Sequence, residues 1–319
     1  MTVTETASAV RDRELSYLTA TELARHFRAH ELSPVEVTQA ILRRIARLEP
    51  ELNAFVLVDH EAALASAKAS EARYHAGVPL SVLDGATVSL KDLLLARGWP
   101  TRKGSRTTSA EGPWNEDSPA AARLREAGAV LLGKTTTTEF GLKGMGDSPL
   151  TGITRNPWNL RHSPGGSSAG AVAAVAAGLG ALAVGTDGGG SIRVPAAFVG
   201  VVGLKPTFGR VPTYPAGVIG APPHVGPIAR RVRDAAALLS VLARPDDRDP
   251  YRLPHDERPL LDAEATTLTG LRIGYSARLF PAELSPELST AFARAVEVRA
   301  RWAPRCLPCK TASSPPLPS

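Results

Sequence analysis

Apolar residues recur every three or four positions in two segments near the N-terminus, ATELARHFRAH and VEVTQAILRRIARL. This period predicts two amphipathic helices. Thr19 with Glu22 precedes the first helix, and Ser33 with Glu36 precedes the second, a spacing typical of the capping box. Residues 1–18 are polar and charged and carry no such period. We therefore expect them to form a flexible N-terminal segment.

Four short apolar runs follow and alternate with helical segments. The runs are AFVLV, ATVSL, AVLLG and ALAVGT, and their lengths fit buried strands. Helices are expected between them, at about residues 61–75, after Ser118 and after Ser168. Strands that alternate with helices indicate an α/β fold with a mostly parallel or mixed sheet. This alternation continues through LRIGYS to a last helix that ends near Trp302, so the main domain spans residues 19–302.

The last seventeen residues, 303–319, have a different composition from the rest. They hold five prolines and both cysteines, Cys306 and Cys309, and show no apolar period. We expect a disordered tail. The cysteine pair lacks a second pair and a strand–helix context, which argues against a redox or metal site.

Charge and apolar length narrow the classes of function. The net charge is +6, but the arginines are spread along the chain, which favours a solvated basic surface over a nucleic-acid interface. No run approaches the roughly 18 apolar residues of a membrane span, and the N-terminus has no signal-peptide core. With so few cysteines, the expected compartment is the reducing cytoplasm.

Two glycine-containing motifs resemble known sites only by their letters. The stretch GAVLLGKT, from Gly128 to Thr135, matches a phosphate-binding loop, but its central residues read as the strand itself. The stretch GSSAG matches a nucleophile elbow centred on Ser168. That elbow needs a preceding strand and a histidine base, whereas a loop precedes it here and no histidine is placed to serve. Both interpretations are disfavoured.

A third motif, GTDGGGSIR, places three glycines before Ser191. Their backbone N–H groups can form an oxyanion hole around a carbonyl that Ser191 attacks. A tight turn before a helix is the alternative explanation of the same glycines.

The residues around Ser167 and Ser191 resemble a known family. The stretch from Ser163 to Pro206, SPGGSSAG…GTDGGGSIRVPAAFVGVVGLKP, is similar to the signature region of the amidase signature enzymes, and GKTTTTEFG, NPWN and HVGPIAR agree with it. The resemblance covers roughly residues 20–300. It implies a mixed β-sheet core covered by helices on both faces. It also implies a catalytic triad of Lys91, Ser167 and Ser191, with a cis peptide bond before Ser167.

The triad has a clear chemical logic. A serine hydroxyl needs a base, and a lysine amine can serve only when it is neutral. Burial lowers the pKa of a lysine, and Lys91 lies between the apolar runs ATVSL and LLLA. Ser167 would pass the proton from Ser191 to Lys91. A buried pair of Lys91 with Asp92 is the alternative, which we disfavour because adjacent strand residues point to opposite faces.

The remaining expected site residues surround this triad. The oxyanion would be held by the backbone N–H groups of Gly188, Gly189, Gly190 and Ser191. Asp187, Arg193, Gly166 and Ser168 would support the loops. The chemistry needs no metal and no cofactor, and the histidines and acids show no ligand spacing.

The implied activity is hydrolysis of a carboxylic amide to an acid plus ammonia or an amine, with a small-molecule amide as the substrate. One alternative is a component similar to the A-type subunit of the tRNA-dependent glutamine amidotransferase, although VPTYPAGVIGAPPHVGP replaces the segment associated with its glutamine site. Another alternative is an inactive remnant, because family members usually continue further and the domain is expected to be truncated at its C-terminal end. The sequence also allows two copies of the chain to form a homodimer.

Overall fold

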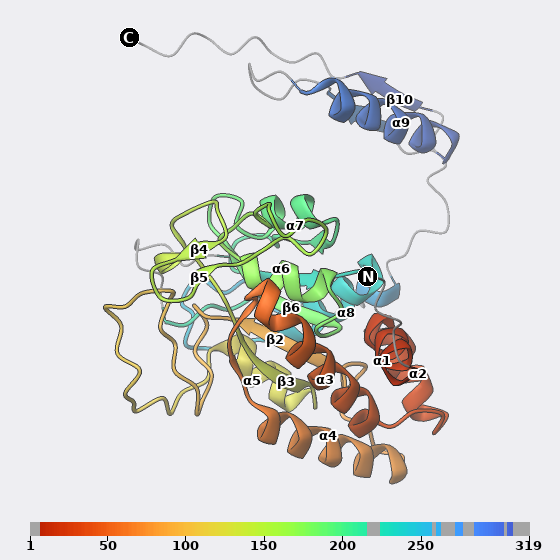
Figure 1. Cartoon of the computed structure of the whole chain (residues 1–319). Coiled ribbons are helices and arrows are strands. Elements are labelled where there is room, and N and C mark those ends of the chain that lie inside the picture. Colours follow the sequence, from red (N-terminus) through yellow and green to blue (C-terminus); the bar gives the residue numbers. More distant parts are fainter. Residues whose placement is uncertain are drawn as a thin grey trace. The chain divides into compact units, whose positions relative to one another are not determined.

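The computed structural model describes residues 7–215, 224–256, 260–262, 272–276, 284–302 and 305–308 (Figure 1). These residues belong to two units, Met1–Leu261 and Asp262–Ser319. Each unit is described by itself.

The larger unit is built on one six-stranded sheet with the strand order β1-β3-β2-β6-β8-β7. Strand β2 pairs in parallel with β3 and β6, whereas β8 runs antiparallel to β6 and β7, and β1 antiparallel to β3. The predicted mixed sheet is therefore confirmed. The strands are β1 (Phe55–Val58), β2 (Thr87–Lys91), β3 (Val130–Thr135), β6 (Leu182–Asp187), β7 (Val202–Gly203) and β8 (His224–Ala229).

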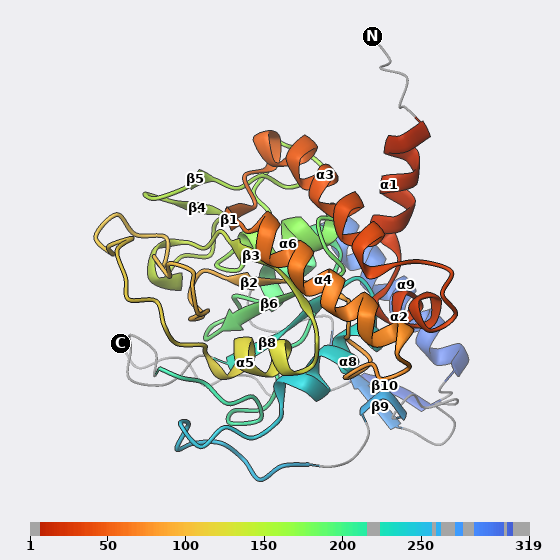
Figure 2. The ribbon, with the colours of Figure 1, turned by 90° about the horizontal axis from the view of Figure 1, so that it is seen from below.

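Helices cover both faces of this sheet. Within β6, Leu182 and Val184 belong to the larger apolar core, whereas Ala183 belongs to a smaller core with residues of α6 and α7. The alternation follows from the two-residue period of a strand. Figure 2 shows α3 and α4 side by side in the larger unit. The helices of this unit are α1 (Ala7–Tyr17), α2 (Ala20–Arg28), α3 (Pro34–Leu52), α4 (His60–His75), α5 (Pro119–Glu126), α6 (Ala169–Ala176), α7 (Arg193–Val199) and α8 (Val232–Leu242).

The expected N-caps of two helices and the four strands expected from the apolar runs, β1, β2, β3 and β6, are confirmed. Thr19 forms the capping box of α2 with Glu22, and the Ser33 side chain caps α3. Most of GAVLLGKT lies in β3, as a strand rather than a phosphate-binding loop. The shorter elements are the 3₁₀ turns η1 (Glu139–Gly141) and η2 (Leu260–Asp262), and the paired strands β4 (Asp147–Ser148) and β5 (Gly152–Ile153).

The expectation of a flexible N-terminal segment, made for residues 1–18, is wrong for Ala7–Tyr17, which form the helix α1. Residues 1–6 lie outside the described residues. Its apolar residues are not gathered on one face, so the sequence pattern did not reveal it. Tertiary contacts stabilise α1 instead. Asp12 is buried and accepts two hydrogen bonds from Arg43 of α3, at 3.0 and 2.7 Å.

Tyr17 and Arg230 attach α1 to the C-terminal end of α6. The Tyr17 hydroxyl donates to the carbonyl oxygen of Ala176 at 3.2 Å, and the guanidinium of Arg230 lies 5.4 Å from the centre of its ring. Arg230 also donates hydrogen bonds to four backbone carbonyl groups, those of Val175, Gly180, Ser16 and Leu18. One guanidinium thus joins segments that lie far apart in the sequence.

The smaller unit contains β9 (Arg272–Tyr275), α9 (Pro286–Trp302) and β10 (Arg305–Pro308). Strand β10 pairs in parallel with β9 over four residue pairs. The prediction that residues 303–319 are all disordered is therefore wrong for 305–308, because backbone pairing does not require an apolar side-chain pattern. Residues 309–319, which include Cys309, lie outside the described residues.

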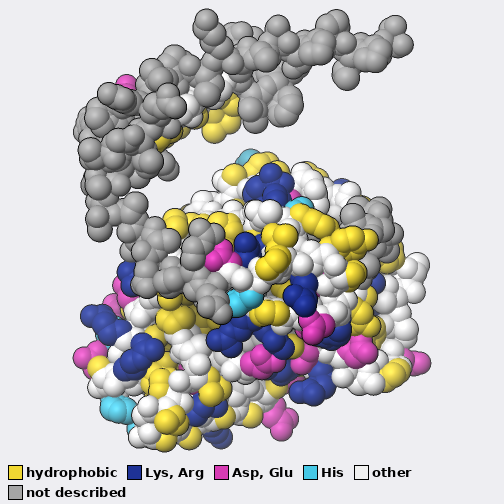
Figure 3. All heavy atoms as spheres, turned by 180° about the vertical axis from the view of Figure 1, so that it is seen from behind, with side chains coloured by type: hydrophobic (Ala, Val, Ile, Leu, Met, Phe, Trp, Pro, Cys, Tyr) yellow, Lys and Arg dark blue, Asp and Glu magenta, His cyan; other side chains and the backbone are white. Residues whose placement is uncertain are grey.

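The surface of the larger unit carries charges of both signs. In the view of Figure 3, lysine and arginine side chains lie among aspartate and glutamate side chains. Among the helices that the structure describes, none has the length and apolarity to cross a membrane.

Replacing Arg230 with lysine is expected to destabilise the larger unit. An ammonium group cannot reach four divergent carbonyl groups as a planar guanidinium does. We expect the free energy of unfolding to fall by about 2 kcal/mol or more, measured by urea denaturation. The control is Arg231→Lys at the exposed neighbouring position. Equal stability of the two variants would contradict this role of Arg230.

Candidate active site

The side-chain amine of Lys91 lies inside a cluster of three hydroxyl groups. Lys91 ends β2 and is 0% exposed. Its Nζ atom lies 2.7 Å from the Oγ of Ser167, 3.0 Å from the Oγ of Ser168 and 2.9 Å from the Oγ1 of Thr186. The two serines precede α6, and the threonine lies near the end of β6. The cluster therefore forms where the carboxyl ends of two parallel strands meet the start of a helix.

Strand alternation directs Lys91 toward α6. Val88 and Leu90 of β2 belong to the larger core, so Lys91 points to the opposite face. Pairing of Leu90 with Val184 places Gly185 next to Lys91 across the two strands. A Cβ atom on Gly185 would lie 2.9 Å from the Oγ of Ser168. The glycine thus leaves room for one of the hydroxyl groups that contact the amine.

Burial decides the protonation of this amine. Loss of solvation lowers the pKa of Lys91 to about 7, while the negative charge of Asp187 acts in the opposite direction. A large fraction of the amine is therefore neutral at neutral pH. A neutral amine has a lone pair and can accept a proton.

Two glycines allow the chain to reach Ser167. Gly165 has φ +78°, and a Cβ on Gly166 would collide with the carbonyl oxygen of Met145. The peptide bond between Gly166 and Ser167 is cis, as the resemblance implies. Gly141 of η1 also lies close to Ser167, since a Cβ there would lie 3.4 Å from the Oγ of Ser167.

Ser191 lies on the turn between β6 and α7. Its backbone carbonyl accepts a hydrogen bond from the N–H of Ser168 at 3.1 Å. This contact joins the glycine-rich turn to the segment that carries Ser167. The backbone of Ser191 thus lies beside the segment that carries Ser167 and Ser168, the two serines in contact with Lys91. Among the described residues, the hydroxyl of Ser191 makes no hydrogen bond.

The carboxylate of Asp187 organises the same turn. It accepts hydrogen bonds from the backbone N–H groups of Gly190 and Ile192 and from the guanidinium of Arg193, with distances of 2.7, 3.1 and 2.9 Å. Burial opposes ionisation, but these hydrogen bonds outweigh it and hold the pKa of Asp187 well below its usual range. The two expected supporting residues, Asp187 and Arg193, therefore act as a pair.

The expectation that the N–H of Gly190 helps to hold the oxyanion is wrong. The N–H of Gly190 is already bound to Asp187 and is not free for an oxyanion. Within the described parts of the chain, no acceptor binds the N–H groups of Gly188, Gly189 or Ser191. Gly188 and Gly189 are exposed, with no atom within 4 Å of a Cβ built on either.

Sequence reasoning missed Thr186 and assigned no partner to Lys134. Thr186 precedes Asp187 in GTDGGG, and only its spatial position beside Lys91 reveals its contact. Lys134 is fully buried, pairs with Asp92 at 3.0 Å and donates to the hydroxyl of Thr101 at 2.8 Å. The lysine of the false phosphate-binding motif is thus the partner of Asp92, which leaves Lys91 free of that carboxylate.

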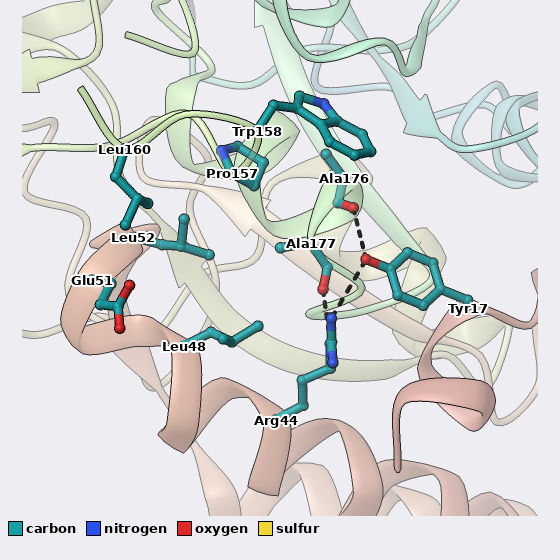
Figure 4. A pocket seen from close by; sticks show the side chains of 10 residues that line it. All are labelled: Tyr17, Arg44, Leu48, Glu51, Leu52, Pro157, Trp158, Leu160, Ala176 and Ala177. Carbon is teal, nitrogen blue, oxygen red and sulfur yellow. Dashed lines mark hydrogen bonds between the residues drawn. The ribbon is translucent and has the colours of Figure 1, made fainter. Parts of the chain in front are cut away.

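A separate cavity of about 280 Å³ lies at the other end of α6 (Figure 4). There Arg44 donates to the carbonyl oxygen of Ala177 and to the hydroxyl of Tyr17. Ala176 and Ala177 lie at the end of α6, whereas Ser167 and Ser168 precede its start, so this cavity is not part of the candidate active site. Its lining residues are Tyr17, Arg44, Leu48, Glu51, Leu52, Pro157, Trp158, Leu160, Ala176 and Ala177.

The described residues contain no group of three or more His, Cys, Asp or Glu side chains that could hold a metal ion.

Comparisons with known proteins place the sequence in a family. The family model described as Amidase matches residues 36–301. The chain is 41% identical over 278 residues to an acylamidase of Rhodococcus erythropolis, covering 87% of this chain and 58% of that protein. It is 41% identical over 290 residues to the A-type subunit of a glutamyl-tRNA(Gln) amidotransferase of Roseiflexus sp. (strain RS-1), covering 89% of this chain and 58% of that protein.

Solved structures give the same result. A bacterial aryl acylamidase of the amidase signature family superimposes with a TM-score of 0.81 at 33% identity, covering 92% of this chain and 61% of that one. The peptide amidase of Stenotrophomonas maltophilia superimposes with a TM-score of 0.80 at 37% identity, covering 92% and 62%. The chain therefore spans about three fifths of the length of these relatives. The match of sequence, sheet and signature loops shows that the chain belongs to the amidase signature family.

Proposed function

We propose that this chain hydrolyses a carboxylic amide to an acid plus ammonia or an amine, through an acyl-enzyme on Ser191. One observation carries the proposal: the buried amine of Lys91, with its pKa lowered to about 7, lies 2.7 Å from the hydroxyl of Ser167. The names of two relatives, acylamidase and peptide amidase, support the same reaction class.

The first step is acylation. The neutral amine of Lys91 has two hydrogens and one lone pair. Ser168 donates its hydroxyl hydrogen to the carbonyl oxygen of Thr186 at 3.3 Å, so it acts as an acceptor toward the amine. Ser167 then donates its proton to the lone pair and takes the proton of Ser191. The Oγ of Ser191 attacks the amide carbon, and the carbonyl oxygen becomes an oxyanion.

The turn before α7 offers donors for that oxyanion. The N–H groups of Gly188, Gly189 and Ser191 are the available ones, because the N–H of Gly190 is bound to Asp187. The pair of Asp187 and Arg193 keeps the turn in one conformation before substrate binds. Such preorganisation stabilises charge without rearrangement during the reaction.

Collapse of the tetrahedral intermediate completes acylation, the first half of the reaction. The proton held by Lys91 returns through Ser167 to the leaving nitrogen, the C–N bond breaks, and ammonia or an amine departs. Water then attacks the acyl-enzyme by the same proton path. The acid is released, and the hydroxyl of Ser191 is restored.

A second candidate is a glutaminase function within a glutamyl-tRNA(Gln) amidotransferase, favoured by the 41% identity to the Roseiflexus protein. Such a chain would release ammonia from glutamine for use by a partner. Ammonia release from glutamine, but not from simple amides, would favour this candidate. An inactive remnant would release ammonia from neither. Residues 216–223, within the segment that replaces the glutamine site, lie outside the described residues.

Ser191 is expected to be the residue labelled by a fluorophosphonate. It is the serine on the glycine-rich turn, and the proposed proton path ends at its hydroxyl. Peptide mapping should find the adduct on Ser191, and Ser191→Ala should remove it. The control is Ser285→Ala, an exposed serine in the smaller unit. An adduct on Ser168 would instead support the nucleophile-elbow interpretation.

Replacing Lys91 with methionine is expected to abolish this labelling near neutral pH, because methionine keeps a similar side-chain length but has no base. In the unaltered chain, the labelling rate should rise as the pH passes about 7, since the neutral amine then predominates.

The control for this experiment is Lys68→Met, at an exposed position of α4. Circular dichroism and thermal unfolding check that each variant is folded. Normal labelling of folded Lys91→Met, or a rate independent of pH between about 5 and 9, would remove Lys91 from the mechanism.

A further inference from the structure

Exposed apolar side chains of two elements lie beside the segments that carry Ser167 and Ser191. We propose that they bind an apolar, uncharged acyl group, so that the substrates are amides of aliphatic or aromatic acids. This inference rests on the proposed amide hydrolysis and specifies which part of the substrate the chain recognises.

The first part of this surface is one side of α7. Val194 and Phe198 are four residues apart, so they share a face of the helix. Their exposed fractions are 41% and 56%, although both are large apolar residues. Pro195, Ala196 and Val199 are buried instead, and the last two pack in the smaller core with residues of α6 and the sheet.

Both exposed side chains lie against the catalytic segments. A Cβ built on Gly190 would lie 3.0 Å from the Cγ2 of Val194, so Val194 contacts the turn that ends at Ser191. A Cβ built on Gly165 would lie 3.3 Å from a ring carbon of Phe198. Phe198 therefore lies against the backbone two residues before Ser167. An acyl group bound at Ser191 has these two side chains as its neighbours.

The second part is the loop after η1. Leu142 and Met145 are 68% and 50% exposed. Leu142 follows Gly141, which lies against the Oγ of Ser167, and the backbone of Met145 abuts Gly166. This loop thus approaches Ser167 from a different element than α7 does. We name these four residues, Val194, Phe198, Leu142 and Met145, the acyl surface.

Charged side chains on these two segments are already paired. Over residues 141–147 and 190–199 they are Lys143, Asp147 and Arg193. Lys143 pairs with Asp147 at 2.7 Å, and Arg193 pairs with Asp187 at 2.9 Å. An acyl group with its own ammonium and carboxylate, as in glutamine, would contact apolar side chains here, and the charged side chains of these segments already form ion pairs with each other or with Asp187. Placing such charges without partners is unfavourable.

The test uses a set of fluorophosphonates whose alkyl chain grows from ethyl to hexyl, with one hexyl-length compound that ends in a carboxylate. The measured quantity is the second-order rate constant for labelling Ser191 in the full chain. Each buried methylene is expected to raise it by up to about fourfold, so hexyl should react at least about tenfold faster than ethyl. The carboxylate compound should react more slowly than hexyl.

Two variants locate the effect. Phe198→Ala should reduce the ratio of the hexyl to the ethyl rate constant by about threefold or more, because part of the acyl surface is removed. Val78→Ala, at a position that is 61% exposed and outside both catalytic segments, should leave this ratio unchanged.

The possible outcomes separate this inference from the proposed function. Labelling of Ser191 with equal rates for ethyl and hexyl, or fastest with the carboxylate, would overturn the apolar acyl group while supporting the serine chemistry. An unchanged ratio in Phe198→Ala would overturn the assigned surface. Absence of any adduct on Ser191 would overturn the proposed function and the inference together.

Discussion

Removal of the Lys91 amine from water is the constraint on which the candidate site depends. A charged amine in an apolar interior is strongly disfavoured, and burial lowers its pKa to about 7. Three hydroxyl groups surround the nitrogen and supply hydrogen bonds without supplying a negative charge. A carboxylate in their place would keep the amine protonated and remove its capacity to act as a base.

Two neighbouring residues of β6 contact different parts of the site. Thr186 contacts the amine of Lys91, while Asp187 binds the turn that leads to Ser191. Arg193 forms an ion pair with Asp187. In the same way, Lys134 binds Asp92, the residue next to Lys91. Both of these buried acids therefore have other cations as partners.

Helix α6 connects this chemistry to the stability of the larger unit. Ser167 and Ser168 precede its first residue, and its C-terminal carbonyl groups accept hydrogen bonds from Tyr17 and Arg230. The helix is eight residues long, which corresponds to about 12 Å. The N-terminal helix α1 therefore contributes to the position of α6 from the end opposite to the site. Four exposed apolar residues, in the loop after η1 and on α7, form the surface that we assign to the acyl group.

The sequence did not reveal the strand β8 (His224–Ala229) or the short strands β4 and β5. By itself, it determined the strands β1, β2, β3 and β6 with the helices between them, an α/β fold with a mostly parallel or mixed sheet, and the membership in the family. These follow from local patterns: apolar periodicity, caps such as Thr19 with Glu22, and a long motif around Ser167 and Ser191. Only the tertiary structure decided the contact of Thr186 with Lys91, the pairing of Asp92 with Lys134, the engaged N–H of Gly190 and the helix α1. Each of these depends on contacts between distant segments or within a turn. Such contacts depend on burial and on the direction of side chains in space. A local pattern of residues predicts neither the burial nor the direction.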